Sequence, residues 1–137
     1  MTGFQWQVRV YYEDTDSGGV VYYANYLRFM ERARTEWMRK LGFEQDRLRQ
    51  EAGILFAVRS ASLEFLRPAR FNDQLAVSVL PVQRRRASLV FDQAVTRSGD
   101  TRGPLCTGRI KIACLDSDTL RPLPIPDSIY KELPDVS

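Results

Sequence analysis

The sequence of 137 residues contains no histidine. This absence excludes several common catalytic systems, because Ser-His-Asp triads, Cys-His pairs, HExxH zinc sites and histidine general bases all require an imidazole. If the protein is an enzyme, carboxylates, hydroxyls or backbone dipoles must carry its chemistry. Acidic side chains are therefore the first candidates for a catalytic site.

Cysteine is nearly absent as well. The two cysteines, Cys106 and Cys114, lie in one strand-like segment, and eight residues of extended chain separate their Cα atoms by about 27 Å. A disulfide requires Cα atoms within about 7 Å of each other. We therefore expect two reduced cysteines, half buried in a sheet.

Long hydrophobic runs are also missing. No apolar segment approaches the roughly 20 residues that a membrane-spanning helix needs, and the first ten residues lack the pattern of a secretory signal. No linker or internal repeat divides the chain, and 44% of its residues are hydrophobic, which suffices for one core. These features predict one cytoplasmic domain over residues 1–137, without a membrane span.

Lysine is scarce but arginine is abundant: three lysines stand against 17 arginines, and the formal net charge is +3. A basic chain is compatible with nucleic-acid binding, which needs an extended basic patch with exposed aromatic side chains. Most aromatic residues here fall on predicted core faces. We therefore expect no nucleic-acid partner, and steeply salt-dependent binding to DNA or RNA would reveal that rival function.

The sequence predicts one strand, one long helix and four more strands. Residues 6–12 alternate apolar and polar side chains, as in a strand. Residues 24–41 carry apolar side chains at helical spacing, and Gly42 is positioned to end this helix. Residues 44–51 predict a short second helix. The later strand-like runs are 55–66, 74–82, 87–96 and 105–115.

These elements indicate an α+β fold. The gaps between the later strands are too short for crossover helices, so neighbouring strands are predicted to pair antiparallel. The long helix must bury its stripe of Phe29 and Trp37, and only one face of the sheet offers a large apolar surface. We expect a curled antiparallel sheet of about five strands wrapped around one long central helix, with the Pro-rich tail from residue 120 as an irregular strap.

The first candidate site is the acidic turn that contains Asp14, Asp16, Gly18 and Gly19. Glycine permits a sharp turn, and the predicted helix begins a few residues later, near Ala24. A carboxylate on one side of a carbonyl and the free N–H groups of a helix N-terminus on the other would form two halves of a catalytic site. The alternative is that the aspartates only stabilise the turn and cap the helix. The spacing does not match a calcium loop.

The second candidate is the basic run of Arg84, Arg85 and Arg86 between two predicted strands. Three guanidinium groups on a hairpin suit phosphate binding. A solvated turn that protects a sheet edge is the alternative. Glu31, which flanks the apolar stripe of the long helix, is a reserve candidate for a catalytic carboxylate, and a solvated acid on the helix surface is the alternative.

The segment VRVYYEDTDSGGVVYYANYLRFMERARTE resembles the first strand, active loop and central helix of the hotdog-fold acyl-CoA thioesterases of the 4-hydroxybenzoyl-CoA thioesterase type. It is closest to the branch associated with the bacterial Tol-Pal cell-envelope system. The similarity continues through SLEFLRPARFNDQL and RRRASLVFDQAV, and it covers roughly residues 6–130.

The resemblance implies a hotdog fold, in which a helix is wrapped by an antiparallel sheet. It also implies a dimer or a homotetramer, with each active site at a subunit interface. Family members hydrolyse acyl-CoA or aroyl-CoA thioesters to the free acid and CoA, without a metal and with no cofactor beyond the CoA of the substrate. We expect the same activity here.

The resemblance also implies roles for individual residues. By position, Asp16 is the catalytic nucleophile or the general base for water, and the backbone N–H of Tyr23 polarises the thioester carbonyl. The Tol-Pal-associated branch usually has histidine at the position of Tyr23, but any residue except proline supplies the N–H. The substrate-binding positions are Tyr12, Gly18, Gly19, Arg84, Arg85, Arg86 and Ser88, of which the last four resemble the part that meets the CoA phosphates in some members.

A binding module without catalysis is the alternative function. Such a protein would sense acyl-CoA or dock on acyl carrier protein, whose acidic surface would suit the arginines. Tight acyl-CoA binding without release of CoA would distinguish it from an enzyme.

Overall fold

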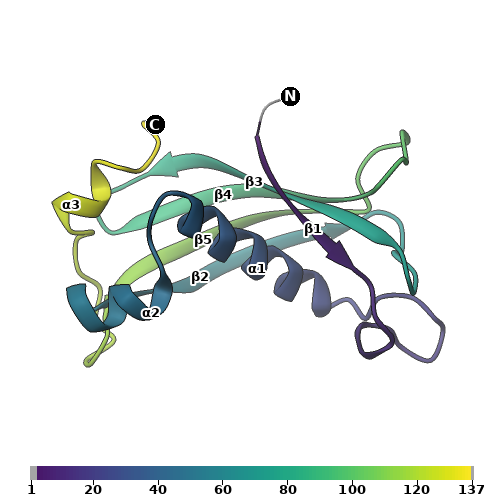
Figure 1. Cartoon of the computed structure of the whole chain (residues 1–137), viewed down its shortest axis with the longest axis horizontal. Helices are drawn as coiled ribbons and strands as arrows, with labels where there is room; N and C mark the ends of the chain where they lie inside the picture. The colour runs from purple at the N-terminus through teal and green to yellow at the C-terminus, as the bar shows by residue number, and fades with distance from the viewer. Residues whose placement is uncertain (1–2, 137) are drawn as a thin grey trace.

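The computed structural model describes residues 3–136; residues 1–2 and 137, which belong to the predicted domain, lie outside the described residues. Five antiparallel strands form one sheet that curls around helix α1 (Figure 1). This arrangement confirms the predicted α+β architecture. The strands are β1 (Phe4–Arg9), β2 (Ile54–Phe65), β3 (Gln74–Arg84), β4 (Ser88–Arg97) and β5 (Cys106–Asp116). The helical segments are η1 (Tyr12–Asp14), α1 (Asn25–Lys40), α2 (Gln45–Arg47), η2 (Leu48–Ala52) and α3 (Asp127–Tyr130).

Helix α1 buries its apolar stripe against the sheet, as predicted. Phe29 and Met30 are fully buried, and the ring of Trp37 meets Phe91 of β4 edge-on at a centroid distance of 5.2 Å. Gly108 of β5 allows this close approach, because a Cβ atom there would lie 3.1 Å from the sulfur of Met30. The helix therefore packs directly on the middle of the sheet.

The strand order is β1-β3-β4-β5-β2. The prediction that neighbouring strands pair is confirmed for β3 with β4 and for β4 with β5, but it is wrong for β2 with β3. Strand β2 pairs instead with β5, at the opposite edge of the sheet from β1. The connection 66–73 crosses the end of the sheet and is held just beyond the end of β1, where Val10 N–H donates to the Asp73 carbonyl at 2.9 Å.

The C-terminal segment covers the other end of the sheet. Its N–H groups at Leu123 and Ile125 donate to the carbonyls of Cys114 and Arg86, and the side chain of Ile125 is fully buried. This strap is irregular apart from the short helix α3. Within residues 3–136, no helix combines the length and the apolar character needed to span a membrane.

Candidate active site

A small hairpin joins η1 to α1 and carries Asp16 at its turn. Three contacts close it: Tyr22 N–H donates to the Asp14 carbonyl at 2.9 Å, Thr15 and Val21 form an antiparallel bridge, and Asp16 N–H donates to the Val20 carbonyl at 2.9 Å. At the tip, the backbone of Gly19 has a φ of 80°, a conformation that residues with a side chain rarely adopt. The predicted sharp turn is therefore present, and we call residues 14–22 the active hairpin.

The two aspartates of the active hairpin have different surroundings. Asp14 is buried, and its Oδ2 accepts a hydrogen bond from Tyr11 N–H at 2.9 Å, while its carbonyl accepts one from the Asn25 side chain at 2.9 Å. Asp16 is exposed, and its Oδ1 accepts a single hydrogen bond from Gly18 N–H at 2.9 Å. Asp14 thus serves the fold of the hairpin, whereas Asp16 presents a carboxylate to solvent.

Gly18 lies next to this carboxylate, and the site has no room for a side chain at this position. A Cβ atom at Gly18 would lie 3.3 Å from Asp16 Oδ1, which is tighter than most real Cβ contacts. The absence of a side chain at Gly18 therefore keeps one side of Asp16 open.

The start of α1 lies at the base of the same hairpin. The N-cap residue of α1 is Ala24, and no side chain caps the helix, so the alternative that an aspartate caps it does not hold. The N–H groups of Tyr22 and Asn25 both have carbonyl acceptors, whereas those of Tyr23 and Ala24 have none among residues 3–136. Two unpaired backbone donors, Tyr23 N–H among them, therefore lie at the helix start, close in sequence to the exposed carboxylate of Asp16.

Exposed aromatic rings surround the active hairpin. The ring of Tyr12, which is 76% exposed, stacks on Phe71 at a centroid distance of 4.0 Å. The ring of Tyr23, which is 60% exposed, meets Phe65 edge-on at 6.0 Å. We call these four residues, with Tyr22, the aromatic patch. Their ring contacts form two groups, Tyr12 with Phe71, and Tyr22 and Tyr23 with Phe65. Exposed apolar surface usually marks a binding site or a protein interface when it is extensive.

The connection 66–73 holds the active hairpin in place. Its Ala69 carbonyl accepts a hydrogen bond from Val21 N–H at 2.8 Å, and Arg70 forms a bridge with Val20. The Ala69 N–H is itself bound to the hydroxyl of Tyr26, a buried residue of α1, at 3.0 Å. Hairpin, connection and helix are thus joined by hydrogen bonds on both sides of Ala69.

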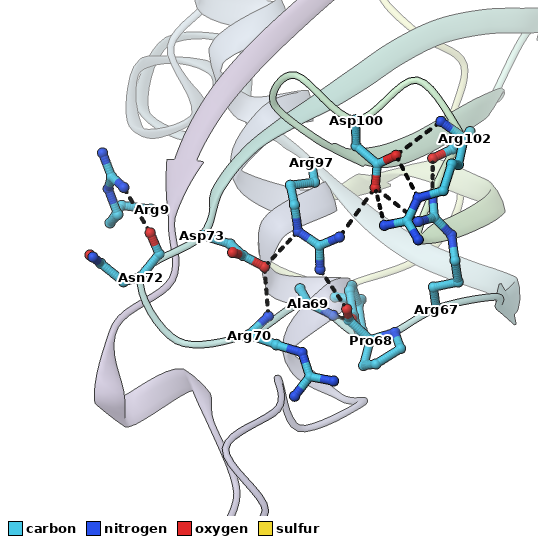
Figure 2. A network of polar contacts seen from close by, with 12 residues as sticks. Arg9, Arg67, Pro68, Ala69, Arg70, Asn72, Asp73, Arg97, Asp100 and Arg102 are labelled. Atoms are coloured by element: carbon cyan, nitrogen blue, oxygen red, sulfur yellow. Dashed lines mark hydrogen bonds and ion pairs between the residues drawn. The ribbon is translucent and has the colours of Figure 1, made fainter.

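Arg97, the last residue of β4, binds this connection through hydrogen bonds from its side chain (Figure 2). Its guanidinium donates to three acceptors: Asp73 Oδ2 at 2.9 Å, the Pro68 carbonyl at 2.9 Å and Asp100 Oδ2 at 3.2 Å. The first two belong to the connection 66–73, and the third belongs to the loop between β4 and β5. One side chain therefore ties together three segments of the chain.

Asp100 is the acceptor at the centre of this cluster. Its side chain is only 5% exposed, and it receives Arg67 at 2.8 Å and Arg102 at 3.1 Å in addition to Arg97. Hydrogen bonds from Arg102, followed by that from Arg67, hold the pKa of the Asp100 carboxyl well below its usual range. Asp100 is therefore ionised at neutral pH. We call Arg67, Asp73, Arg97, Asp100 and Arg102 the arginine network.

The turn between β3 and β4, which contains the predicted basic run, lies at the other end of the sheet from the connection between β1 and α1 (Figure 1). Strand β3 begins at Gln74, beside the connection 66–73, and ends at Arg84, about 33 Å away at ~3.3 Å per residue. Ser88 is buried at the start of β4. A single chain therefore does not bring Arg84, Arg85, Arg86 or Ser88 next to Asp16.

Arg84 and Arg86 also have partners in the C-terminal segment. Arg84 donates to the carbonyls of Tyr130 and Leu133 at 3.1 and 3.2 Å, and its guanidinium lies 4.3 Å from the centre of the Tyr130 ring. Arg86 pairs with Asp127 at 3.4 Å. Arg85 is exposed, and no side-chain partner is found for it within the described residues.

Sequence reasoning missed the arginine network and the buried pair of Arg34 and Gln93. The network joins residues far apart in the chain, so no local pattern indicates it. Arg34 carried a signal, because it lies four residues after Met30 and three before Trp37, on the buried stripe of α1.

A model of the thioesterase-like superfamily matches residues 10–133. The chain belongs to the thioesterase-like superfamily. Among relatives, the acyl-CoA thioester hydrolase YbgC of Escherichia coli O6:H1 is 42% identical over 131 residues, which cover 96% of each chain. The acyl-CoA thioesterase YbgC of Haemophilus influenzae is 39% identical over 127 residues, 93% of this chain and 91% of the relative.

A solved structure shares the fold of this thioesterase-like chain. A probable thioesterase from Bartonella henselae superimposes with a TM-score of 0.83 at 31% identity, covering 91% of this chain and 100% of the other. The hotdog fold predicted from the sequence is thereby confirmed.

The two cysteine thiols lie outside the active hairpin, in strand β5. Cys106 and Cys114 are free, as expected, and they are fully buried in β5 rather than half buried; burial raises the pKa of their thiols to about 12 and about 11. Both are therefore protonated at neutral pH and are poor nucleophiles. In the described part of the chain, no three His, Cys, Asp or Glu side chains form a group that could hold a metal ion.

Proposed function

We propose that this protein hydrolyses acyl-CoA or aroyl-CoA thioesters to the free acid and CoA. One observation carries the proposal: an exposed carboxylate, Asp16, lies on the active hairpin, and a backbone donor unpaired among residues 3–136, Tyr23 N–H, follows this hairpin directly at the start of α1. Similarity to the YbgC proteins, which are named as acyl-CoA thioesterases, supports the same substrate class.

The proposed reaction needs no histidine. The N–H of Tyr23 donates to the thioester oxygen and stabilises the negative charge that develops there. Asp16 takes a proton from water while the water oxygen attacks the carbonyl carbon; the C–S bond then breaks, and the proton passes to the sulfur of CoA. In the alternative route, Asp16 attacks the carbon itself, expels the CoA thiolate, and water hydrolyses the resulting anhydride. Either route uses one carboxylate.

Three further residues of the proposed site receive the acyl group. Gly18 and Gly19 leave room for the thioester beside Asp16, because neither carries a side chain. Tyr12, exposed and stacked on Phe71, offers an apolar wall. The aromatic patch therefore suits an acyl or aroyl group next to the reacting carbonyl.

We further propose that the protein acts as a homo-oligomer, a dimer or a tetramer. The exposed aromatic patch and the unpaired edge of β2 support this, because both expose surface that a second copy would cover. In such an assembly, the basic run of a neighbouring copy would reach the CoA phosphates. Arg85 is the best placed of the three for this role, since Arg84 and Arg86 bind the C-terminal segment.

The cellular setting is also a proposal. The resemblance of the first segment to the Tol-Pal-associated branch supports a cytoplasmic enzyme linked to that system, with acyl carrier protein as a further partner. Copurification of this chain with acyl carrier protein or with Tol-Pal components would test both links.

The test of the proposed function is CoA release. We expect the wild-type protein to free CoA, detected with a thiol-reactive dye, from at least one member of a panel that runs from short to long acyl-CoA and includes benzoyl-CoA. Tight binding of these esters without CoA release would contradict hydrolysis and favour the binding module.

A further inference from the structure

Two adjacent residues at the start of α1, Asn25 and Tyr26, hold opposite strands of the active hairpin, and the proposed reaction uses neither side chain. The first strand is bound directly, because Nδ2 of Asn25 donates to the carbonyl of Asp14 at 2.9 Å. Asp16 follows two residues later, where this strand enters the turn. The Asn25 side chain therefore sets the place of the strand that leads to the carboxylate.

The second strand is bound to Tyr26 through one residue of the connection 66–73, Ala69. The hydroxyl oxygen of Tyr26 accepts a hydrogen bond from Ala69 N–H at 3.0 Å, and the Ala69 carbonyl accepts one from Val21 N–H at 2.8 Å. Tyr26 and Ala69 are buried, at 4% and 0% exposed. The place of Val21, and with it the second strand, is therefore set by the Tyr26 hydroxyl.

The peptide unit that joins Pro68 to Ala69 is bound at both ends. Its carbonyl accepts a hydrogen bond from Arg97 at 2.9 Å, and its N–H donates to Tyr26 at 3.0 Å. Loss of the Tyr26 hydroxyl would leave this buried N–H without an acceptor, which is unfavourable. A shift of the peptide unit toward water would relieve the loss, but it would also move the Ala69 carbonyl and hence Val21.

The proposed reaction depends on the spacing that these hydrogen bonds set. The thioester carbon must meet Asp16 on one side, while its oxygen meets the N–H of Tyr23 on the other. Tyr23 is fixed to the helix, because its carbonyl accepts a hydrogen bond from Tyr26 N–H at 3.3 Å, whereas Asp16 lies at the turn of the hairpin. Misplacement of a reacting group by about 1 Å can lower turnover about a hundredfold.

We propose that Asn25 and Tyr26 are positioning residues for thioester hydrolysis: their side chains hold the two strands of the active hairpin against α1, so that Asp16 keeps its place relative to Tyr23 N–H. This inference rests on the proposed function, because turnover is what the positioning serves. Burial raises the pKa of the Tyr26 hydroxyl above its ordinary value. The hydroxyl is therefore uncharged at neutral pH, and its role is that of a hydrogen-bond acceptor rather than a base.

The experiment compares CoA release by Tyr26→Phe and by the wild type. This variant keeps the ring that contacts Phe29 and Phe65 and loses only the hydroxyl. We expect kcat per folded molecule to fall about tenfold, with KM unchanged, because no group that meets the substrate is altered. Asn25→Ala, which removes the donor to Asp14, should lower kcat in the same way.

Ser78→Ala is the matched control. The Ser78 hydroxyl also accepts a backbone N–H, that of Ala94 at 2.9 Å, but this hydrogen bond joins β3 to β4 within the sheet. Urea unfolding should show a similar loss of stability for both hydroxyl variants, while kcat of the control stays at the wild-type value. Amide hydrogen exchange is a second readout: Tyr26→Phe should speed exchange at Ala69 and Val21 and leave Ala94 unchanged.

The outcomes separate this inference from the proposed function. Normal kcat in folded Tyr26→Phe and Asn25→Ala, beside an active wild type, would overturn the inference alone. So would an equal fall of kcat in Ser78→Ala, or a rise in KM with kcat unchanged, which would assign the side chains to stability or to substrate binding. If Tyr26→Phe does not fold, Asn25→Ala decides. A wild type that releases no CoA would overturn the proposed function, and the inference with it.

Discussion

The two ends of the sheet use arginine differently. At the end that carries the active hairpin, Arg67, Arg97 and Arg102 converge on the enclosed carboxylate of Asp100. At the other end, the Arg84 side chain is also enclosed, at 18% exposed, but the carboxylate with which it pairs, Asp135, is 97% exposed. Enclosed, multiply bonded charges resist motion, whereas exposed pairs contribute little. The run of three arginines attracts attention in the sequence, but the scattered arginines are the ones that hold the active hairpin in position.

Among substitutions at the two ends of the sheet, Arg97→Ala should cause the largest losses of stability and of CoA release. The change removes three hydrogen bonds that tie the connection 66–73 to β4 and its loop. We expect the free energy of unfolding to fall by about 2 kcal/mol, together with a loss of CoA release, because the active hairpin rests on this connection. Urea unfolding measures the first effect. Arg102→Ala, at a side chain that is 70% exposed, is the control with a smaller loss; equal losses would show that the two positions do not differ.

The matching change at the opposite end, Arg84→Ala, should have a smaller effect. It removes contacts to two carbonyls and to the Tyr130 ring, so we expect a loss of about 1 kcal/mol. Limited proteolysis should show faster cleavage within the C-terminal strap, with CoA release per folded molecule nearly unchanged. A loss of activity as large as that of Arg97→Ala would remove the contrast between the two ends.

The pH dependence of stability tests how much the Asp100 carboxylate stabilises the end of the sheet that carries the active hairpin. The pKa of Asp100 is lower in the folded chain than in the unfolded chain, where it is about 4. Its stabilising effect is therefore complete above that pH and is lost as the pH falls further, through the folded pKa. We expect Asp100→Asn to melt below the wild type at pH 7 and pH 5, and the gap to narrow at pH 3. A gap that stays constant across this range would mean that the charge of Asp100 is not the source of its effect.

The smallest effect should come from Arg85→Ala. This side chain is exposed, so its loss should leave the melting temperature unchanged. If it meets the CoA phosphates of a substrate, KM for CoA esters should rise by about threefold, as expected for an exposed ion pair, while KM for a thioester truncated before the nucleotide stays the same. Equal changes for both substrates would mean that Arg85 does not contact the nucleotide.

Local patterns predicted most of the fold. The stripe of α1 and the alternation of β3, β4 and β5 are local properties, and the structure confirms them. Strand pairing across the connection 66–73 was predicted wrongly, because short connections usually join neighbours. Here that connection binds the active hairpin and crosses the end of the sheet, which only long-range contacts such as Val21 to Ala69 reveal.

The candidate site was predictable in composition but not in detail. The turn at Gly18 and Gly19 followed from the sequence, whereas the different surroundings of Asp14 and Asp16 did not, because burial depends on segments far along the chain. Arg34 was predictable from its spacing on α1. The arginine network was not, since Arg67, Asp73 and Asp100 share no local pattern.

The most direct test is the rate of CoA release by Asp16→Asn, measured with the best acyl-CoA substrate and compared with Asp14→Asn. Asp16 is exposed and accepts one local hydrogen bond, so Asp16→Asn should melt like the wild type while kcat falls by about a hundredfold or more. Asp14 is buried and binds the Tyr11 N–H, so Asp14→Asn should lower the melting temperature instead. Near-normal turnover by a stably folded Asp16→Asn protein would contradict the catalytic role of Asp16.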